Sequence, residues 1–165
     1  MSNPDDPRAS EPNDPEELRF EYTPSDEPRP EQETENPHAH DTTRVPEVID
    51  ALRTEFGEAI LDVERYANED TVYVEKERIQ DICRFLKEDQ NFEYFVDLGG
   101  IDRFTDEDRF EVFYNIVSVE RQKRIRLKVR VDENDMRVPS VTDIYRAANW
   151  NEREAYDMFG FEFVD

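Results

Sequence analysis

The stretch that decides the fold lies in the second half of the chain and reads Arg124-Ile125-Arg126-Leu127-Lys128-Val129-Arg130-Val131. Apolar and cationic residues alternate through it without a break. Because successive side chains of a strand point to opposite faces, the alternation predicts a β-strand with one apolar and one cationic face. We therefore expect a sheet that buries one of its faces.

The residues before this strand predict its neighbours in the sheet. Aromatic and β-branched residues fill 110–119, and 120–123 has the composition of a turn, so the two strands should lie antiparallel. Another strand is expected from Phe92 to Leu98, where Gly99-Gly100 would end it.

A helix and a hairpin are predicted earlier in the chain. Pro46 begins a helical pattern that Gly57 is placed to end. The segments 59–66 and 71–74 read as two strands, and the turn at 68–70 should join them as a hairpin.

A second helix is predicted from Lys76 to Lys87, with Cys83 on its apolar face as a small core residue rather than a reactive thiol. The predicted fold class is α+β: a mixed or antiparallel sheet with helices on one face. The expected order is α-β-β-α-β-β-β, followed by short helices.

The first part of the chain has a different composition. Nine of the ten prolines lie within residues 1–46, and residues 1–44 carry thirteen Asp/Glu against four Arg. Such a segment buries too little apolar surface to offset the entropy of ordering it, so 1–45 is predicted to be a disordered acidic tail. Residues 46–165 are predicted to form the domain. With no secretory signal and no apolar run of membrane-spanning length, the protein is expected to be soluble by itself.

Several functional classes are excluded by composition. A single cysteine, Cys83, allows no internal disulfide, no self-contained iron–sulfur cluster and no thiolate zinc site. Both histidines, His38 and His40, lie in the predicted tail, and the four glycines form no phosphate-binding loop. The formal net charge of −22 argues against nucleic-acid binding and suits either a salt-rich cytoplasm or an ordinary acidic protein. No catalytic residue, metal or cofactor is expected in this chain.

Near the end of the chain lies the segment Asn149-Trp150-Asn151-Glu152-Arg153-Glu154-Ala155-Tyr156-Asp157-Met158-Phe159-Gly160. This segment predicts a short helix. Asn149 or Asn151 could cap its start, with a Glu three residues later in each case, and Gly160 could end it in a left-handed conformation. Arg153 and Asp157 are four residues apart and could pair on one face.

The pattern Trp-x-Glu-Arg-Glu-x-x-Asp-Met-Phe-Gly in that segment resembles the first half of a family signature, that of the 30 kDa (or C) subunit of NADH-quinone oxidoreductase, respiratory complex I. The resemblance covers about residues 46–163 and implies an α–β(2)–α–β(3) domain. Weaker matches lie at 92–102, Phe110-Glu111-Val112-x-Tyr114, 124–129 and Pro139-Ser140-Val141-Thr142-Asp143-Ile144-Tyr145. The family signature continues into Gly-His-Pro and Arg-rich stretches, but this chain stops at Asp165, so we expect either a fragment or a short gene product.

The resemblance implies a non-redox scaffold subunit in the hydrophilic arm of the complex, docked on the quinone-site subunit. NADH, FMN, the iron–sulfur clusters and quinone would then belong to the assembled complex. The protein would lie peripherally on the cytoplasmic face of the bacterial inner membrane. We expect the last helix to form the subunit interface through Trp150, Glu152, Arg153, Glu154, Tyr156, Asp157, Met158, Phe159 and Gly160.

Three alternatives remain open from the sequence. The same domain could serve a membrane-bound hydrogenase-type complex. A free-standing module could bind an acidic partner, and a carboxylate enzyme could use Glu152, Glu154 and Asp157. The cationic face of the binding module would consist of Arg121, Lys123, Arg124, Arg126, Lys128 and Arg130.

Overall fold

A computed structural model describes residues 44–104 and 108–164. The predicted tail lies almost entirely outside these residues, so its disorder remains a prediction. The described part contains α1 (Pro46–Phe56), η1 (Gly57–Ala59), β1 (Ile60–Tyr66), β2 (Glu69–Val74), η2 (Lys76–Arg78), α2 (Ile79–Glu88), β3 (Tyr94–Asp102), β4 (Phe110–Ser118), β5 (Lys123–Val131), β6 (Arg137–Pro139), α3 (Ala148–Phe159) and β7 (Glu162–Val164).

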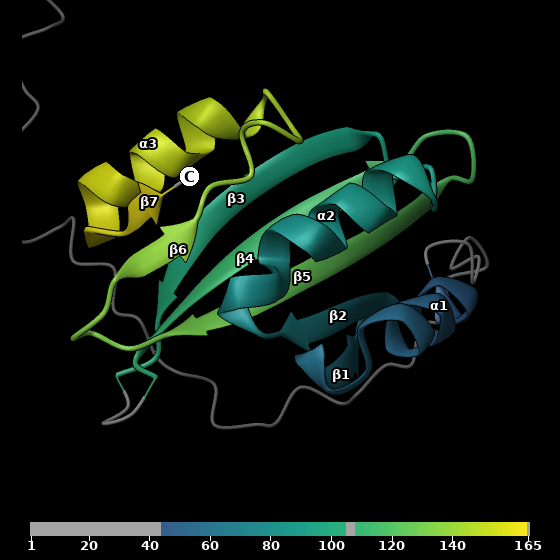
Figure 1. Cartoon of the computed structure of the whole chain (residues 1–165), viewed down its shortest axis with the longest axis horizontal. Helices are drawn as coiled ribbons and strands as arrows, with labels where there is room; N and C mark the ends of the chain where they lie inside the picture. The colour runs from purple at the N-terminus through teal and green to yellow at the C-terminus, as the bar shows by residue number, and fades with distance from the viewer. Residues whose placement is uncertain (1–43, 105–107, 165) are drawn as a thin grey trace, which may run out of the picture. The chain divides into compact units, whose positions relative to one another are not determined.

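The main sheet has five strands in the order β1-β2-β5-β4-β3 (Figure 1). β4 and β5 pair antiparallel from Phe110 opposite Val131 to Ser118 opposite Lys123, as the sequence predicted. β2 and β5 are parallel, which places the β1–β2 hairpin beside the long strands and makes the sheet mixed. A small parallel pair, β6 and β7, forms a separate two-stranded sheet.

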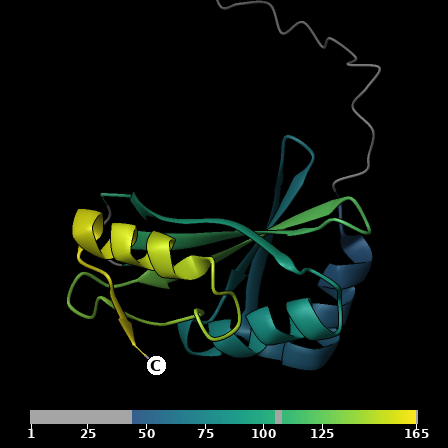
Figure 2. The same cartoon turned by 90° about the horizontal axis from the view of Figure 1, so that it is seen from above.

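One face of the main sheet carries the core. The apolar residues of β5, Ile125, Leu127, Val129 and Val131, are fully buried there. α1 and α2 lie side by side over this face (Figures 1 and 2). The predicted α+β class with helices on one face is therefore confirmed.

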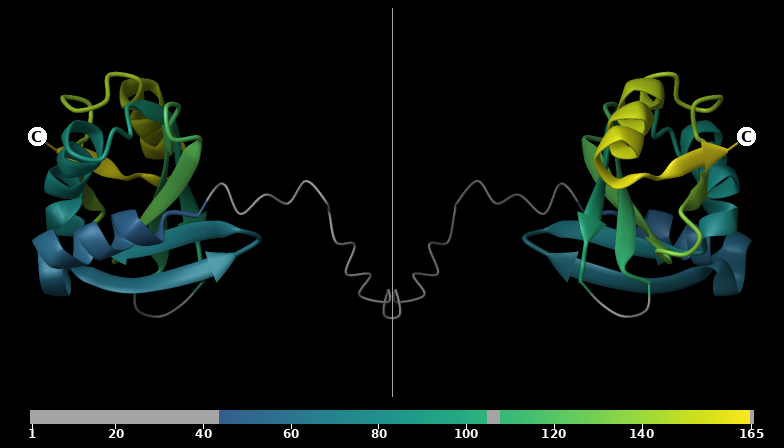
Figure 3. Two further views of the ribbon diagram at one scale, coloured as in Figure 1. Left: turned by 90° about the vertical axis from the view of Figure 1, so that its right-hand side faces the viewer. Right: turned by 90° about the vertical axis from the view of Figure 1, so that its left-hand side faces the viewer.

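The β1–β2 hairpin turns earlier than expected. Its turn residues are Ala67 and Asn68, both at positive φ (50° and 63°), and β2 already begins at Glu69. The predicted turn at 68–70 was wrong because Glu69 and Asp70 pair in register with Tyr66 and Arg65. Two positive φ values in a two-residue loop match the twist of the strands. The hairpin runs along the lower edge of the folded part in Figure 3.

The two glycines of β3 lie inside the strand, whereas the sequence predicted that they end it. A Cβ on Gly99 would lie 2.8 Å from Cζ of Phe113, and one on Gly100 would lie 2.6 Å from Cδ2 of Phe159. The rings pack directly on the strand backbone, so glycine serves close approach here rather than a turn.

The last helix, α3, ends as predicted but begins differently. Gly160 is left-handed at φ 84°, and its N–H donates to the Tyr156 carbonyl oxygen. The prediction of an asparagine cap was wrong, because residue 147 precedes the helix with no side-chain cap. A series of turns from 141 to 147 leads into α3, and the Ala148 N–H donates to the Tyr145 carbonyl oxygen at 2.9 Å.

Candidate functional site

The inward face of α3 is formed by Ala148, Glu152 and Ala155, all buried. The Glu152 carboxylate accepts hydrogen bonds from the Ser140 hydroxyl at 2.9 Å and from the Val141 N–H at 2.8 Å. A buried carboxylate held by such bonds ties the helix to the turn before it. Glu152 is therefore a packing residue of the domain and is not available to a docking partner.

The outward face of α3 carries large exposed side chains. Trp150, Tyr156 and Met158 are 75%, 56% and 68% exposed. The other exposed members of the predicted interface are Arg153, Glu154, Asp157 and Gly160. Together these seven residues are called the outer face of α3.

The charged side chains of α3 and its last aromatic residue differ in the contacts they make. Arg153 and Asp157 form no ion pair with each other, although both belong to the described residues, so the predicted pairing was wrong. Phe159 is half-buried and stacks on Phe161 with ring centroids 5.6 Å apart, which anchors the end of the helix on Gly100. Since Glu152 points inward and Glu154 is exposed, the carboxylates do not converge on one catalytic site.

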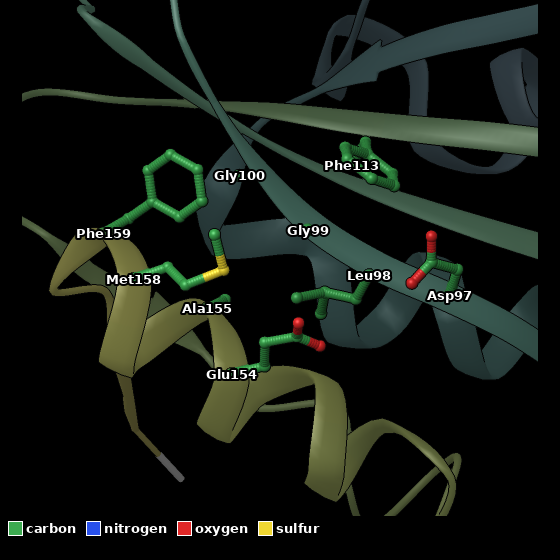
Figure 4. Close-up of a pocket in the computed structure, with 9 residues that line it drawn as sticks. All are labelled: Asp97, Leu98, Gly99, Gly100, Phe113, Glu154, Ala155, Met158 and Phe159. Atoms are coloured by element: carbon green, nitrogen blue, oxygen red, sulfur yellow. The ribbon is translucent and has the colours of Figure 1, made fainter. Parts of the chain in front are cut away.

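A groove of about 240 Å³ runs between α3 and the edge strand β3 (Figure 4). β3 lines it from Asp97 to Gly100, and α3 lines it with Glu154, Ala155, Met158 and Phe159. The two walls are also joined by a hydrogen bond from the Asn151 Nδ2 to the Asp97 Oδ1 at 3.1 Å.

Sequence reasoning missed both this groove and the inward position of Glu152. The spacing of Ala148, Glu152 and Ala155 on one helical face was a usable signal, because two small residues mark the side that packs closely. Nothing in the sequence indicates that α3 would lie along β3.

Three cations of strand β5 form ion pairs with carboxylates on the neighbouring strands. Arg124 and Arg126 both pair with Glu69 of β2, the second at 2.9 Å, and Arg126 also donates to Asn115. Lys128 pairs with the buried Glu111 at 2.9 Å.

The remaining cations of this face differ in their contacts. The Arg130 guanidinium lies 5.2 Å from the centre of the Tyr73 ring. Arg121 and Lys123 form no ion pair within the described part of the chain. The face is alternating as predicted, but four of its six cations already have partners in the fold.

Buried titratable groups elsewhere belong to the core. Cys83 is fully buried, and burial raises the pKa of its thiol far above the usual value, with a smaller contribution from the charge of Glu152. Burial likewise raises the pKa of Tyr114 and Tyr145. Among the described residues, three or more His, Cys, Asp or Glu side chains nowhere gather as metal ligands would, and none of the helices is long and apolar enough to cross a membrane.

Comparison with known proteins identifies the family. Residues 72–165 match the family described as respiratory-chain NADH dehydrogenase, 30 Kd subunit. The chain belongs to this family. The resemblance drawn from the sequence motifs is confirmed.

Relatives within the 30 kDa subunit family support the assignment. The chain is 42% identical over 119 residues to the C subunit of the NADH-quinone oxidoreductase of Roseiflexus sp. (strain RS-1), covering 71% of this chain and 68% of that protein. It is 39% identical over 129 residues to the C subunit of Hyphomonas neptunium, covering 77% of this chain and 58% of the relative. In the C/D subunits of Acinetobacter baumannii, the matching part is 21% of their length.

Two solved structures share the fold. The trypsin-resistant fragment of Nqo5 aligns with a TM-score of 0.62 and 31% identity, over 71% of this chain and 92% of that one. A chain of the membrane-bound sulfane sulfur reductase, an archaeal respiratory membrane complex, aligns with a TM-score of 0.62 and 26% identity. That alignment covers 71% of this chain and 68% of the archaeal one.

Proposed function

We propose that this chain is a non-redox scaffold subunit of the hydrophilic arm of an NADH-quinone oxidoreductase. It docks on the quinone-site subunit through the outer face of α3 and thereby supports electron transfer from NADH to quinone. Membership in the 30 kDa subunit family and the identity to the C subunits of two such enzymes support the assignment to this complex.

The observation that carries the docking role is the exposure of large side chains on one short helix. Trp150 and Tyr156 are the kinds of residue that dominate binding energy at protein interfaces, and Met158 adapts to irregular partners. Arg153 lies between them with no carboxylate paired to it in the described part, so it can form a bidentate pair with a partner carboxylate.

In this proposal the chain itself carries no cofactor or metal. NADH, FMN, the iron–sulfur clusters and quinone are bound by other subunits of the complex. The protein is held peripherally on the cytoplasmic face of the bacterial inner membrane through those subunits.

A second candidate is the equivalent subunit of a related membrane complex of the hydrogenase type. The alignment with a chain of the archaeal membrane-bound sulfane sulfur reductase supports it, because a domain of this fold then also occurs in a respiratory membrane complex of another name. Affinity isolation from native membranes separates the two candidates. A co-purifying flavoprotein that binds NADH supports the first, and a complex without one supports the second.

The docking role is tested by Trp150→Ala and Arg153→Ala in the full chain, expressed in native membranes. Loss of a central aromatic or paired arginine at an interface costs about 2 kcal/mol or more, so the amount of assembled complex should fall. NADH–quinone activity should fall with it, and activity per assembled complex should stay nearly unchanged.

Tyr66→Ala serves as the matched control for these variants. Tyr66 is an aromatic residue that is 85% exposed at the hairpin turn, and its loss should leave assembly intact. Normal assembly of the Trp150 and Arg153 variants with abolished turnover would contradict the scaffold role and point to quinone chemistry.

A further inference from the structure

The groove between α3 and β3 combines an apolar wall with two carboxylates. In Figure 4 the side chains of Met158 and Phe159 lie towards one end of the groove and Asp97 lies towards the other, with Glu154 between them on the helix side. Met158 is 68% exposed, and the Phe113 ring lies half-buried over Gly99. The groove therefore adjoins the outer face of α3 and presents both an apolar and an anionic surface.

The two carboxylates of this groove are not neutralised by the fold. Within the described part of the chain, neither Asp97 nor Glu154 forms an ion pair, and Asp97 accepts only the hydrogen bond from Asn151. Three other carboxylates of the sheet do pair with cations: Glu69 pairs with Arg124 and Arg126, Glu111 with Arg103 and Lys128, and Asp102 with Arg109.

The apolar wall and the two carboxylates of the groove favour one kind of side chain as its ligand. A purely apolar side chain would remove water from the two carboxylates without replacing their hydrogen bonds, which is costly. An acidic side chain would be repelled. An arginine lays its aliphatic stem along apolar side chains such as Met158 and keeps its guanidinium at a polar end. That guanidinium pairs with carboxylates in a bidentate way and stacks on rings such as Phe113.

We propose that the groove between α3 and β3 receives an arginine side chain of the partner subunit that docks on the outer face of α3. This inference rests on the proposed function and adds the chemistry of the partner. Trp150 and Tyr156 supply the apolar contact, and the groove supplies the charge that orients the partner on α3.

The test removes the charge of the groove and preserves its shape, with Asp97→Asn and Glu154→Gln combined in the full chain. The amide oxygen introduced at position 97 can still accept the hydrogen bond from Asn151. In membranes, the amount of complex retained after extraction at rising salt is measured by co-isolation. We expect several-fold less complex than wild type at about 0.15 M salt, where surface charges are already partly screened. The melting temperature of the purified chain should not change.

The matched control removes the same amount of charge elsewhere, with Asp50→Asn and Glu58→Gln, both exposed at α1 and η1. This variant should retain as much complex as wild type. An equal loss in the control would mean that only net charge matters, and it would overturn the proposal.

The other outcomes separate the groove from the docking role itself. If the double variant assembles like wild type while Trp150→Ala loses the complex, the groove proposal fails and the docking role stands. If neither change affects assembly, both fail. If the double variant assembles better than wild type, the groove binds no cation and the proposal is overturned.

Discussion

Two buried tyrosines of the core differ in what their hydroxyl groups contact. The Tyr145 hydroxyl donates to the Phe92 carbonyl oxygen at 2.7 Å and lies 3.3 Å from the carbonyl oxygen of Cys83. The Tyr114 hydroxyl is fully buried and has no hydrogen-bond partner among the described residues. A buried hydroxyl without a partner loses its hydrogen bonds to water and gains none in return.

The pair of substitutions Tyr114→Phe and Tyr145→Phe should therefore have opposite effects on stability. Tyr145→Phe should lower the free energy of unfolding by about 0.5–1.5 kcal/mol, the net value of a hydrogen bond. Tyr114→Phe should raise it by about 1 kcal/mol, because the orphaned hydroxyl is removed. Urea unfolding followed by fluorescence measures both, and destabilisation by Tyr114→Phe would show that its hydroxyl has a partner.

At the scale of elements, the inward-facing side chains of α3 fix its position on the domain, and its outward-facing side chains are exposed. Glu152 fastens the helix to the turn at Ser140 and Val141, and Asn151 fastens it to β3. Ala155 lets the helix approach closely, since it is 3% exposed. The helix is thus held in a fixed orientation by side chains that do not belong to its outer face.

Two glutamates two residues apart on α3 should differ sharply in their contribution to stability. Glu152→Ala leaves the Val141 N–H and the Ser140 hydroxyl without their acceptor, so it should destabilise the domain by about 2–3 kcal/mol. Glu154→Ala, at an exposed position, should change stability by less than about 0.5 kcal/mol. Chemical denaturation of the two purified variants tests this. Equal losses of stability would mean that the hydrogen bonds of the Glu152 carboxylate do not stabilise the domain.

For the molecule as a whole, one core connects the first helix to the last strands. It extends from Val45 at the start of α1 to Phe161 after α3, and all its members lie in the described part. Val45 itself is fully buried, and its N–H donates to Asp70 Oδ2 at 2.9 Å. The core therefore needs the chain from about residue 44 onward.

A chain that starts at Asp41 should keep its stability, whereas one that starts at Val48 should not. The first variant retains every core residue, so its melting temperature should change by less than about 4 °C, which corresponds to less than about 1 kcal/mol in a domain of this size. The second loses Val45 and the bond to Asp70, a cost of about 2 kcal/mol or more. Calorimetry measures both, and a large drop for the first variant would mean that earlier residues pack on the domain.

Much of the fold could be predicted because it depends on local periodicity. The alternation at 124–131, the helical spacing after Pro46 and the glycine at 160 each report on the geometry of their own segment. Some errors were local, such as the exact turn of the β1–β2 hairpin and the start of α3. Others came from positions where distant residues decide. Gly99 and Gly100 look like a strand end, and only the rings of Phe113 and Phe159 show why they lie within a strand.

The family and the helix that we propose as its interface were therefore contained in the sequence, since both rest on motifs of neighbouring residues. The cationic face of β5 and the role of Glu152 were decided by tertiary structure. Glu69 and Glu111 pair with three of the six cations of that face, and the Ser140 hydroxyl and the Val141 N–H bind the Glu152 carboxylate. Sequence spacing specifies which way a side chain points, but only the packed fold determines which groups meet it there.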